Sequence, residues 1–111
     1  MRRIVWTFSL LSLAISAALA QDPVKVDPQH YKVEFENAQV RIMRVIRGPH
    51  EKSPLHEHPN YVAIFLTDGP GGRKAKQAQW RDAIKHEEEN TTDKATETVV
   101  VELKPSRAPG K

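Results

Sequence analysis

The stretch from Gly48 to Pro59, which reads GPHEKSPLHEHP, decides how the rest of the chain is interpreted. It places His56 and His58 two residues apart, directly before a run of apolar residues. Residues two apart on a strand point to the same face, so these two imidazoles can converge while Glu57 faces away. Such a pair can bind zinc, iron, copper, nickel or manganese. The alternative is that the pair contributes only polarity to the surface.

A third ligand would complete one side of a metal site and leave other positions open for water or substrate. His86 is the obvious candidate, because a neighbouring strand could bring it opposite the pair. The sequence therefore predicts a divalent transition metal held by His56, His58 and His86. The choice among iron, zinc, nickel, copper and manganese stays open, and no catalytic residue is assigned.

Short strands are predicted on both sides of this stretch. Alternating apolar and charged residues indicate strands over 31–37 and 39–47, and apolar runs indicate strands over 61–67 and 97–103. Residues 48–59 look turn-rich, and residues 73–90 are expected to hold at most one short strand or helical turn. Several short strands without a strong helix predict an all-β antiparallel sandwich or barrel.

From about Tyr31 to Lys104 the sequence resembles the cupin superfamily. Residues that fit the first cupin motif are Gly48, Pro54, His56, His58 and Gly69, and those that fit the second are Trp80, His86 and Asn90. The resemblance implies an antiparallel jelly-roll β-barrel that carries its metal on the three histidines.

Two departures from the cupin pattern change these expectations. Val62 stands where the first motif has a glutamate, which should lower the affinity for manganese and other ions that prefer carboxylates. Only ten residues separate Gly69 from Trp80, so the barrel is expected to be shortened by about one hairpin. An edge would then need cover, and a homodimer that buries Val62, Ile64 and Leu66 is one solution.

Other polar and aromatic residues near the motifs are given structural roles. Glu88 shares the face of His86 and could replace the missing carboxylate, but its place in an acidic run favours a solvated position. Trp80 is expected in the core. His50 and Glu51 are expected on the surface, and His30 is given no role.

Residues 1–20 have the organisation of a cleavable signal peptide. Arg2 and Arg3 precede a mostly apolar segment, and Ala18-Leu19-Ala20 forms a small-x-small cleavage site. The competing interpretation is a membrane anchor, but the segment is short and lacks a basic flank on its C-terminal side. The predicted organisation is a signal peptide at 1–20, an extended arm at 21–30, a cupin-like domain at 31–104 and a disordered tail at 105–111.

Composition narrows the classes of function. The chain has no cysteine, which excludes disulfides and thiolate ligands, and residues 21–111 carry 15 basic against 14 acidic residues, which argues against nucleic-acid binding. One remaining class is a metal-dependent enzyme, an oxygenase or isomerase, acting on a small organic molecule. The alternative is a non-enzymatic ligand-binding or assembly module with a degenerate metal site.

The signal peptide predicts a periplasmic or secreted protein without a stable membrane anchor. We expect the exported protein to begin at Gln21 because cleavage after Ala20 fits the small-x-small rule. N-terminal sequencing of protein recovered from the periplasm or the medium measures this directly. Recovery there of a chain that still begins with Met1 would contradict it.

Overall fold

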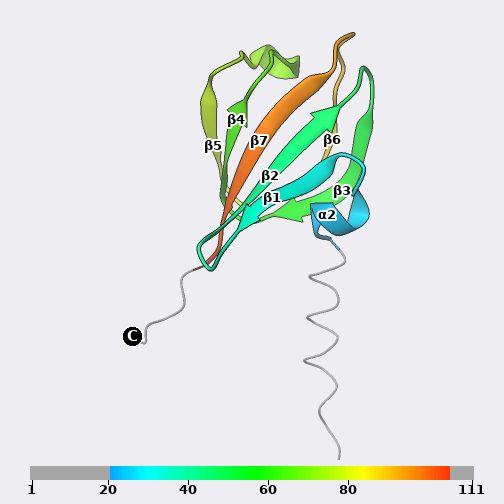
Figure 1. The fold of residues 1–111 in the computed structure, drawn as a ribbon. Helices are drawn as coiled ribbons and strands as arrows, with labels where there is room; N and C mark the ends of the chain where they lie inside the picture. Colours follow the sequence, from blue (N-terminus) through cyan, green and yellow to red (C-terminus); the bar gives the residue numbers. More distant parts are fainter. Residues whose placement is uncertain (1–20, 106–111) are drawn as a thin grey trace, which may run out of the picture.

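The computed structural model describes residues 21–105, so the predicted signal peptide and residues 106–111 of the predicted tail lie outside the described part. Antiparallel strands make up most of it (Figure 1). The elements are α2 (Pro23–Val26), β1 (Tyr31–Glu36), β2 (Val40–Arg47), β3 (Lys52–His58), β4 (Tyr61–Phe65), the 3-10 turn η1 (Pro70–Gly72), β5 (Ala78–Arg81), β6 (Ile84–Glu89) and β7 (Thr96–Leu103). Neither helical segment is long enough to cross a membrane.

The strands form two sheets. Five strands pair in the order β1-β2-β7-β4-β5, and β3 pairs with β6 in a separate two-stranded sheet. The predicted all-β antiparallel fold is confirmed, and the arrangement is consistent with a jelly roll although the two sheets do not close into a barrel. The inner face of the larger sheet carries the apolar core, which consists of Tyr31, Met43, Val45, Tyr61, Ala63, Phe65 and Val100.

The four strands predicted from alternation and apolar runs are present within two residues of their expected ends. The predictions for the two intervening regions were wrong. Residues 52–58 form β3 rather than turn, and residues 73–90 contain two strands, β5 and β6. Both strands of the smaller sheet have many exposed positions, so they lack the apolar periodicity on which strand prediction relies.

A β-bulge in β3 sets the direction of its side chains. Ser53 pairs with Glu88 and His56 with His86, so β3 has one residue more than β6 over this interval. The extra residue falls at Pro54-Leu55, where a proline is tolerated because a bulge interrupts the ladder. As a result Ser53, His56 and His58 are all buried on the same side of the strand.

Residues 21–30 do not form the extended arm expected from their prolines. The side chain of Asp22 caps the helical turn α2 by accepting a hydrogen bond from the amide of Val24 at 3.1 Å, and Pro23 occupies the first turn. Arg41 on β2 donates two hydrogen bonds to the Asp22 carboxylate. These hydrogen bonds fix residues 21–30 to β2 of the larger sheet.

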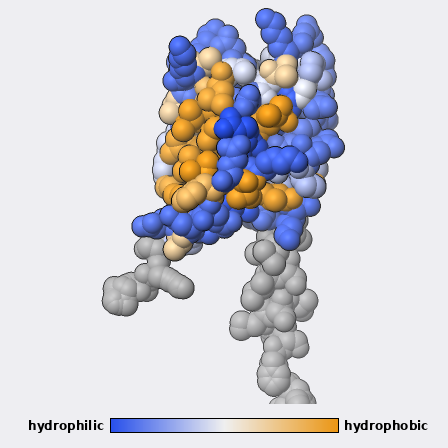
Figure 2. Space-filling view, viewed as in Figure 1, coloured by the Kyte–Doolittle hydropathy of each residue, from blue (hydrophilic) through white to orange (hydrophobic). Residues whose placement is uncertain are grey.

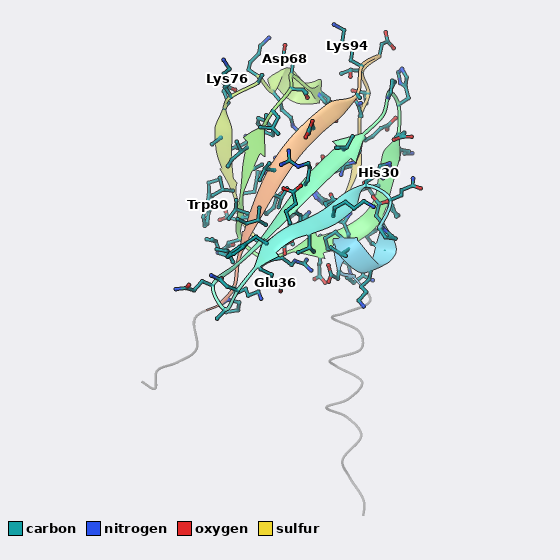
Figure 3. All side chains as sticks on the ribbon, in the orientation of Figure 1. His30, Glu36, Asp68, Lys76, Trp80 and Lys94 are labelled. Atoms are coloured by element: carbon teal, nitrogen blue, oxygen red, sulfur yellow. The ribbon has the colours of Figure 1, made fainter. Side chains whose placement is uncertain are left out.

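The outer face of the larger sheet is apolar for a surface. Figure 2 shows apolar side chains gathered over β4, β7 and β2 and crossed by a hydrophilic band. On this face Arg44 forms ion pairs with Glu34 and Glu97, so these three charged side chains interact with one another within the chain. Trp80, expected in the core, instead lies on the edge strand β5 with 52% of its surface exposed (Figure 3).

The homodimer stays a prediction, and the outer face is where we expect it. Burying exposed apolar side chains there would be favourable, and the internally paired charges would not repel a second copy. Light scattering at tens of micromolar should give twice the monomer mass. Leu66→Lys should yield monomers, whereas Leu55→Lys, at a leucine of similar exposure on β3, should not. A monodisperse wild-type monomer would contradict the prediction.

Candidate metal centre

The structure brings the three predicted histidines together. His56 and His86 lie directly opposite each other in the β3–β6 pair, and His58 follows two residues along β3. One ring nitrogen from each lies within 4.8 Å of the others. The ring centroids are 4.8 to 5.4 Å apart, and the rings meet nearly edge to face. Side chains so arranged can hold one metal ion between them.

Two of the histidines are held in a defined tautomer by their neighbours. Nδ1 of His56 lies 2.7 Å from the carbonyl oxygen of Pro54, and Nδ1 of His58 lies 2.7 Å from a carboxylate oxygen of Glu102. A carbonyl or an ionised carboxylate can only accept, so each Nδ1 carries the proton and each Nε2 carries the lone pair that a metal would use. Partners of this kind orient metal-binding histidines and raise their basicity.

The third histidine has a nitrogen without a partner. Nε2 of His86 is buried and makes no hydrogen bond with any residue in 21–105. An unsatisfied buried polar atom costs about 1–3 kcal/mol, so such atoms normally find a partner. A metal ion between the three rings would supply one. The residues therefore fit a metal in donor type and in the geometry of their free nitrogens.

Burial keeps the imidazoles of His56 and His86 neutral, as metal binding requires. Desolvation lowers the pKa of His86 from its ordinary value of 6.5 to about 4, although Glu88 opposes this shift. Desolvation likewise lowers the pKa of His56, against the opposing effect of its hydrogen bond to Pro54. Two of the three rings thus carry lone pairs over the whole neutral range.

Glu102 connects the site to the N-terminal segment. Its carboxylate accepts from His58 on one oxygen and from Arg41 on the other, at 2.7 and 2.9 Å. Arg41 in turn binds Asp22. Glu102 is only 4% exposed, so the ion pair with Arg41 is what makes this buried carboxylate tolerable. The sequence pattern did not indicate Glu102, which shares the inner face of β7 with the core residue Val100.

A phenol and a guanidinium lie behind His56. The Tyr31 hydroxyl is 3.1 Å from Nε2 of His56 and accepts a hydrogen bond from Arg47 at 2.8 Å. Burial raises the pKa of Tyr31, despite the nearby positive charge of Arg47, so the phenol stays protonated and donates to His56. A metal that uses this nitrogen would take the place of that hydrogen bond and free the hydroxyl. Neither residue was predicted from the sequence to belong to the site.

A cavity of about 30 Å³ lies beside the histidines, between the two sheets. His58 and His86 form one side, and apolar residues of the larger sheet form the floor. Three arginines and one glutamate also line it: Arg47, Arg73, Arg81 and Glu88. This space is enough for about one or two water molecules beside the cluster.

The position of Glu88 corrects one prediction. It is not solvated: its side chain is 17% exposed and accepts a hydrogen bond from Arg73 at 3.3 Å. Burial alone would raise its pKa, but Arg73 and Arg47 hold the pKa below its usual range. Its carboxylate lies 3.6 Å from Nδ1 of His86, so it is close to the cluster but engaged with arginines.

Val62, which stands where the first cupin motif has a glutamate, does not face the histidine cluster. Val62 pairs with Trp80 and alternates with Tyr61 and Ala63, which belong to the inner core. Val62 therefore lies on the outer face of β4, and a carboxylate there would not reach the histidines. Ala63, the next residue, lines the cavity.

The remaining histidines lie outside the cluster. His50 is exposed, as expected, and binds Asp93 at the surface. His30, to which no role was given, is buried between two carboxylates, with Asp27 at 2.9 Å on one nitrogen and Glu51 at 3.0 Å on the other. It fixes the end of α2 to the turn before β3, which is a structural role.

The comparisons agree with this architecture. The chain is similar to a cupin domain from Bordetella pertussis Tohama I, with a TM-score of 0.62 and 22% identity over 68% of this chain and 92% of that one. It is also similar to the TT1209 protein from Thermus thermophilus, with a TM-score of 0.52 and 15% identity over 72% and 90% of the two chains. No protein-family model and no curated protein matches the sequence. These likenesses show that the chain has the cupin fold.

The lowered pKa of His86 predicts how the stability of metal-free protein depends on pH. Between about pH 6.5 and 4 the unfolded chain binds a proton at His86 that the folded chain does not. The free energy of unfolding should therefore fall as the pH decreases through this range. Urea denaturation at pH 7, 5 and 4 measures the slope.

Glutamine cannot take up this proton, so His86→Gln should reduce the pH dependence of unfolding. His50→Gln, at an exposed histidine, is the matched control and should leave the slope close to that of wild type. Equal slopes for wild type and His86→Gln would contradict the prediction.

Proposed function

We propose that this protein binds one divalent transition metal through His56, His58 and His86 and acts on a small organic molecule. The observation that carries the proposal is the buried, unpartnered Nε2 of His86 beside two histidines whose Nδ1 atoms are already occupied. A bound divalent metal would supply Lewis acidity toward a small molecule that reaches it. Imidazole nitrogens without a carboxylate favour zinc, iron, copper or nickel over manganese.

The protein's own groups define what the site does. Pro54 and Glu102 keep the His56 and His58 rings oriented, and the protonated Tyr31 offers a hydrogen-bond donor at the edge of the cluster. Apolar residues of the larger sheet line the small cavity beside the cluster. These features support an enzyme, although they name no reaction, because a fold alone does not specify one.

A second candidate is a ligand-binding or assembly module without catalysis. The apolar outer face of the larger sheet favours it, since this surface suits association rather than chemistry. Metal content of protein purified without a histidine tag separates the two candidates. We also propose, on the signal-peptide pattern of residues 1–20, that the protein functions outside the cytoplasm.

The metal site is tested by titrating metal-stripped protein with zinc and following binding by calorimetry. Wild type should bind one ion per chain, and alanine at any of the three histidines should weaken binding strongly because each removes a ligand. Glu102→Gln should weaken it about 10- to 100-fold, the usual effect of losing a group that orients a metal-binding histidine.

His50→Ala is the matched control, because this histidine is exposed and lies outside the cluster. It should bind zinc as wild type does. If wild type and all three cluster variants bind equally weakly, the site does not exist. If only His86→Ala matches wild type, the pair binds without its third partner and the enzyme proposal loses its support.

A further inference from the structure

A continuous chain of polar side chains runs from the N-terminal segment to the histidine cluster. Asp22 accepts two hydrogen bonds from Arg41, at 2.8 and 3.0 Å. Arg41 donates two more to one oxygen of Glu102, at 2.9 and 3.1 Å. The other oxygen of Glu102 lies 2.7 Å from Nδ1 of His58. An ionised group takes part in every link, which makes these hydrogen bonds stronger than those between neutral groups.

Arg41 is a single positive charge that serves two carboxylates. All three nitrogens of its guanidinium are engaged, and Nη2 bonds to both Asp22 and Glu102. The side chains of Asp22, Arg41 and Glu102 are only 18, 14 and 5% exposed, so water and salt screen these interactions less than they would on the surface. Because one guanidinium is divided between them, each carboxylate is compensated less than it would be by an arginine of its own.

Asp22 is ionised at neutral pH, as this division of charge requires. Burial would raise the pKa of its carboxyl, but the hydrogen bonds from Arg41 and from the amide of Val24 hold the pKa below its usual range. The bond from Val24 caps α2 and needs only an oxygen, whereas the effect on Arg41 needs the negative charge. Asparagine caps helices about as well as aspartate does, so substitution with asparagine separates the two roles.

The consequence of this sharing lies at His58. A carboxylate that keeps more of its negative charge is a stronger acceptor for the proton on Nδ1 of a histidine. A stronger acceptor there fixes the orientation of the ring and makes Nε2 a better electron donor to a metal. By drawing part of the Arg41 charge away from Glu102, Asp22 strengthens the hydrogen bond between Glu102 and His58.

We propose that Asp22 is a positioning residue of the metal site, which acts through Arg41 and Glu102 to strengthen the hydrogen bond that orients His58. The part of this inference that concerns metal rests on the proposed function. Coupling between two sites is reciprocal, so a metal on His58 would in turn favour the contact between Asp22 and Arg41. Residues 21–30 should therefore be held more tightly in the zinc-loaded protein than in the metal-free protein.

The first test is the zinc affinity of metal-stripped protein, measured by calorimetry. Asp22→Asn keeps the helix cap and removes the charge. It should weaken zinc binding about three- to tenfold, which is less than the effect of Glu102→Gln because Asp22 acts at a greater distance from the histidine. In protein that already carries Glu102→Gln, Asp22→Asn should cause no further loss, because the effects of residues in one network do not add.

Glu34→Gln is the matched control. Glu34 and Glu97 share Arg44 on the outer face of the sheet, as the two inner carboxylates share Arg41. Glu34→Gln therefore removes one of two carboxylates from an arginine on the same strand, away from the histidines. It should leave zinc affinity unchanged.

A second measurement needs no metal and would not respond to a merely structural role. The nuclear magnetic resonance shift of the proton on Nδ1 of His58 reports the strength of its hydrogen bond. In metal-stripped protein, Asp22→Asn should move this signal to lower frequency, and Glu34→Gln should not.

Hydrogen exchange tests the reciprocal effect of the metal on the N-terminal segment. The amides of Lys25, Val26 and Asp27 close the turn of α2 through backbone hydrogen bonds. Zinc should slow the exchange of these amides in wild type, and the slowing should be smaller in Asp22→Asn.

The outcomes separate this inference from the metal proposal. If wild type and Asp22→Asn bind zinc equally and the His58 proton does not move, Asp22 only caps α2 and the inference is wrong. If the effects of Asp22→Asn and Glu102→Gln on zinc affinity add, Asp22 acts by another route and the inference is also wrong. If wild type fails to bind zinc while the His58 proton still moves in Asp22→Asn, the action of Asp22 on His58 is upheld and the metal proposal fails.

Discussion

Hydrogen bonding between buried polar side chains is the constraint on which this structure depends. The space between the two sheets contains His56, His58, Ser53, Arg47, Asn90 and Glu102, all nearly inaccessible to solvent. Each must find a partner, because an unpaired polar group in the interior is costly. Asn90, for example, donates to backbone carbonyls of Arg47, Gly48 and Lys94, and so joins the end of β6 to the loop after β2. The smaller sheet is therefore held to the larger one by directional bonds as well as by apolar contact.

This constraint gives the site its precision. Groups that orient the histidines also hold the fold together, as when Glu102 binds His58 and at the same time compensates Arg41. The orienting groups come from different elements: Pro54 from the bulge of β3, Glu102 from β7 and Tyr31 from β1. Packing the two sheets and aligning the imidazoles are consequently one process. The partnerless nitrogen of His86 stands out because nearly every other buried side chain in residues 21–105 is satisfied.

The sequence predicted what local spacing controls. The two-residue spacing of His56 and His58 indicated a shared face. Alternation located β1 and β2, and apolar runs located β4 and β7, to within two residues. Contributions from distant strands were missed: nothing local distinguishes Glu102 from any other charged residue in a strand, or Tyr31 from an ordinary core aromatic. Glu88 and Trp80 were misplaced for a related reason, since their exposure depends on which strand lies opposite. The bulge was not readable either, because Pro54 could equally have belonged to a turn.

The bulge at Pro54-Leu55 makes the length of β3 as important as its composition. Ser53 and His56 are three residues apart yet face the same side, which is a combination that a regular strand does not allow. Loss of one residue there would leave both histidines in the chain while reversing their orientation relative to Ser53 and the start of the strand. Two related chains could therefore share every metal-binding residue and still differ in whether those residues meet. In this protein, deletion of one residue from β3 would therefore disturb the histidine cluster more than many substitutions on the surface would.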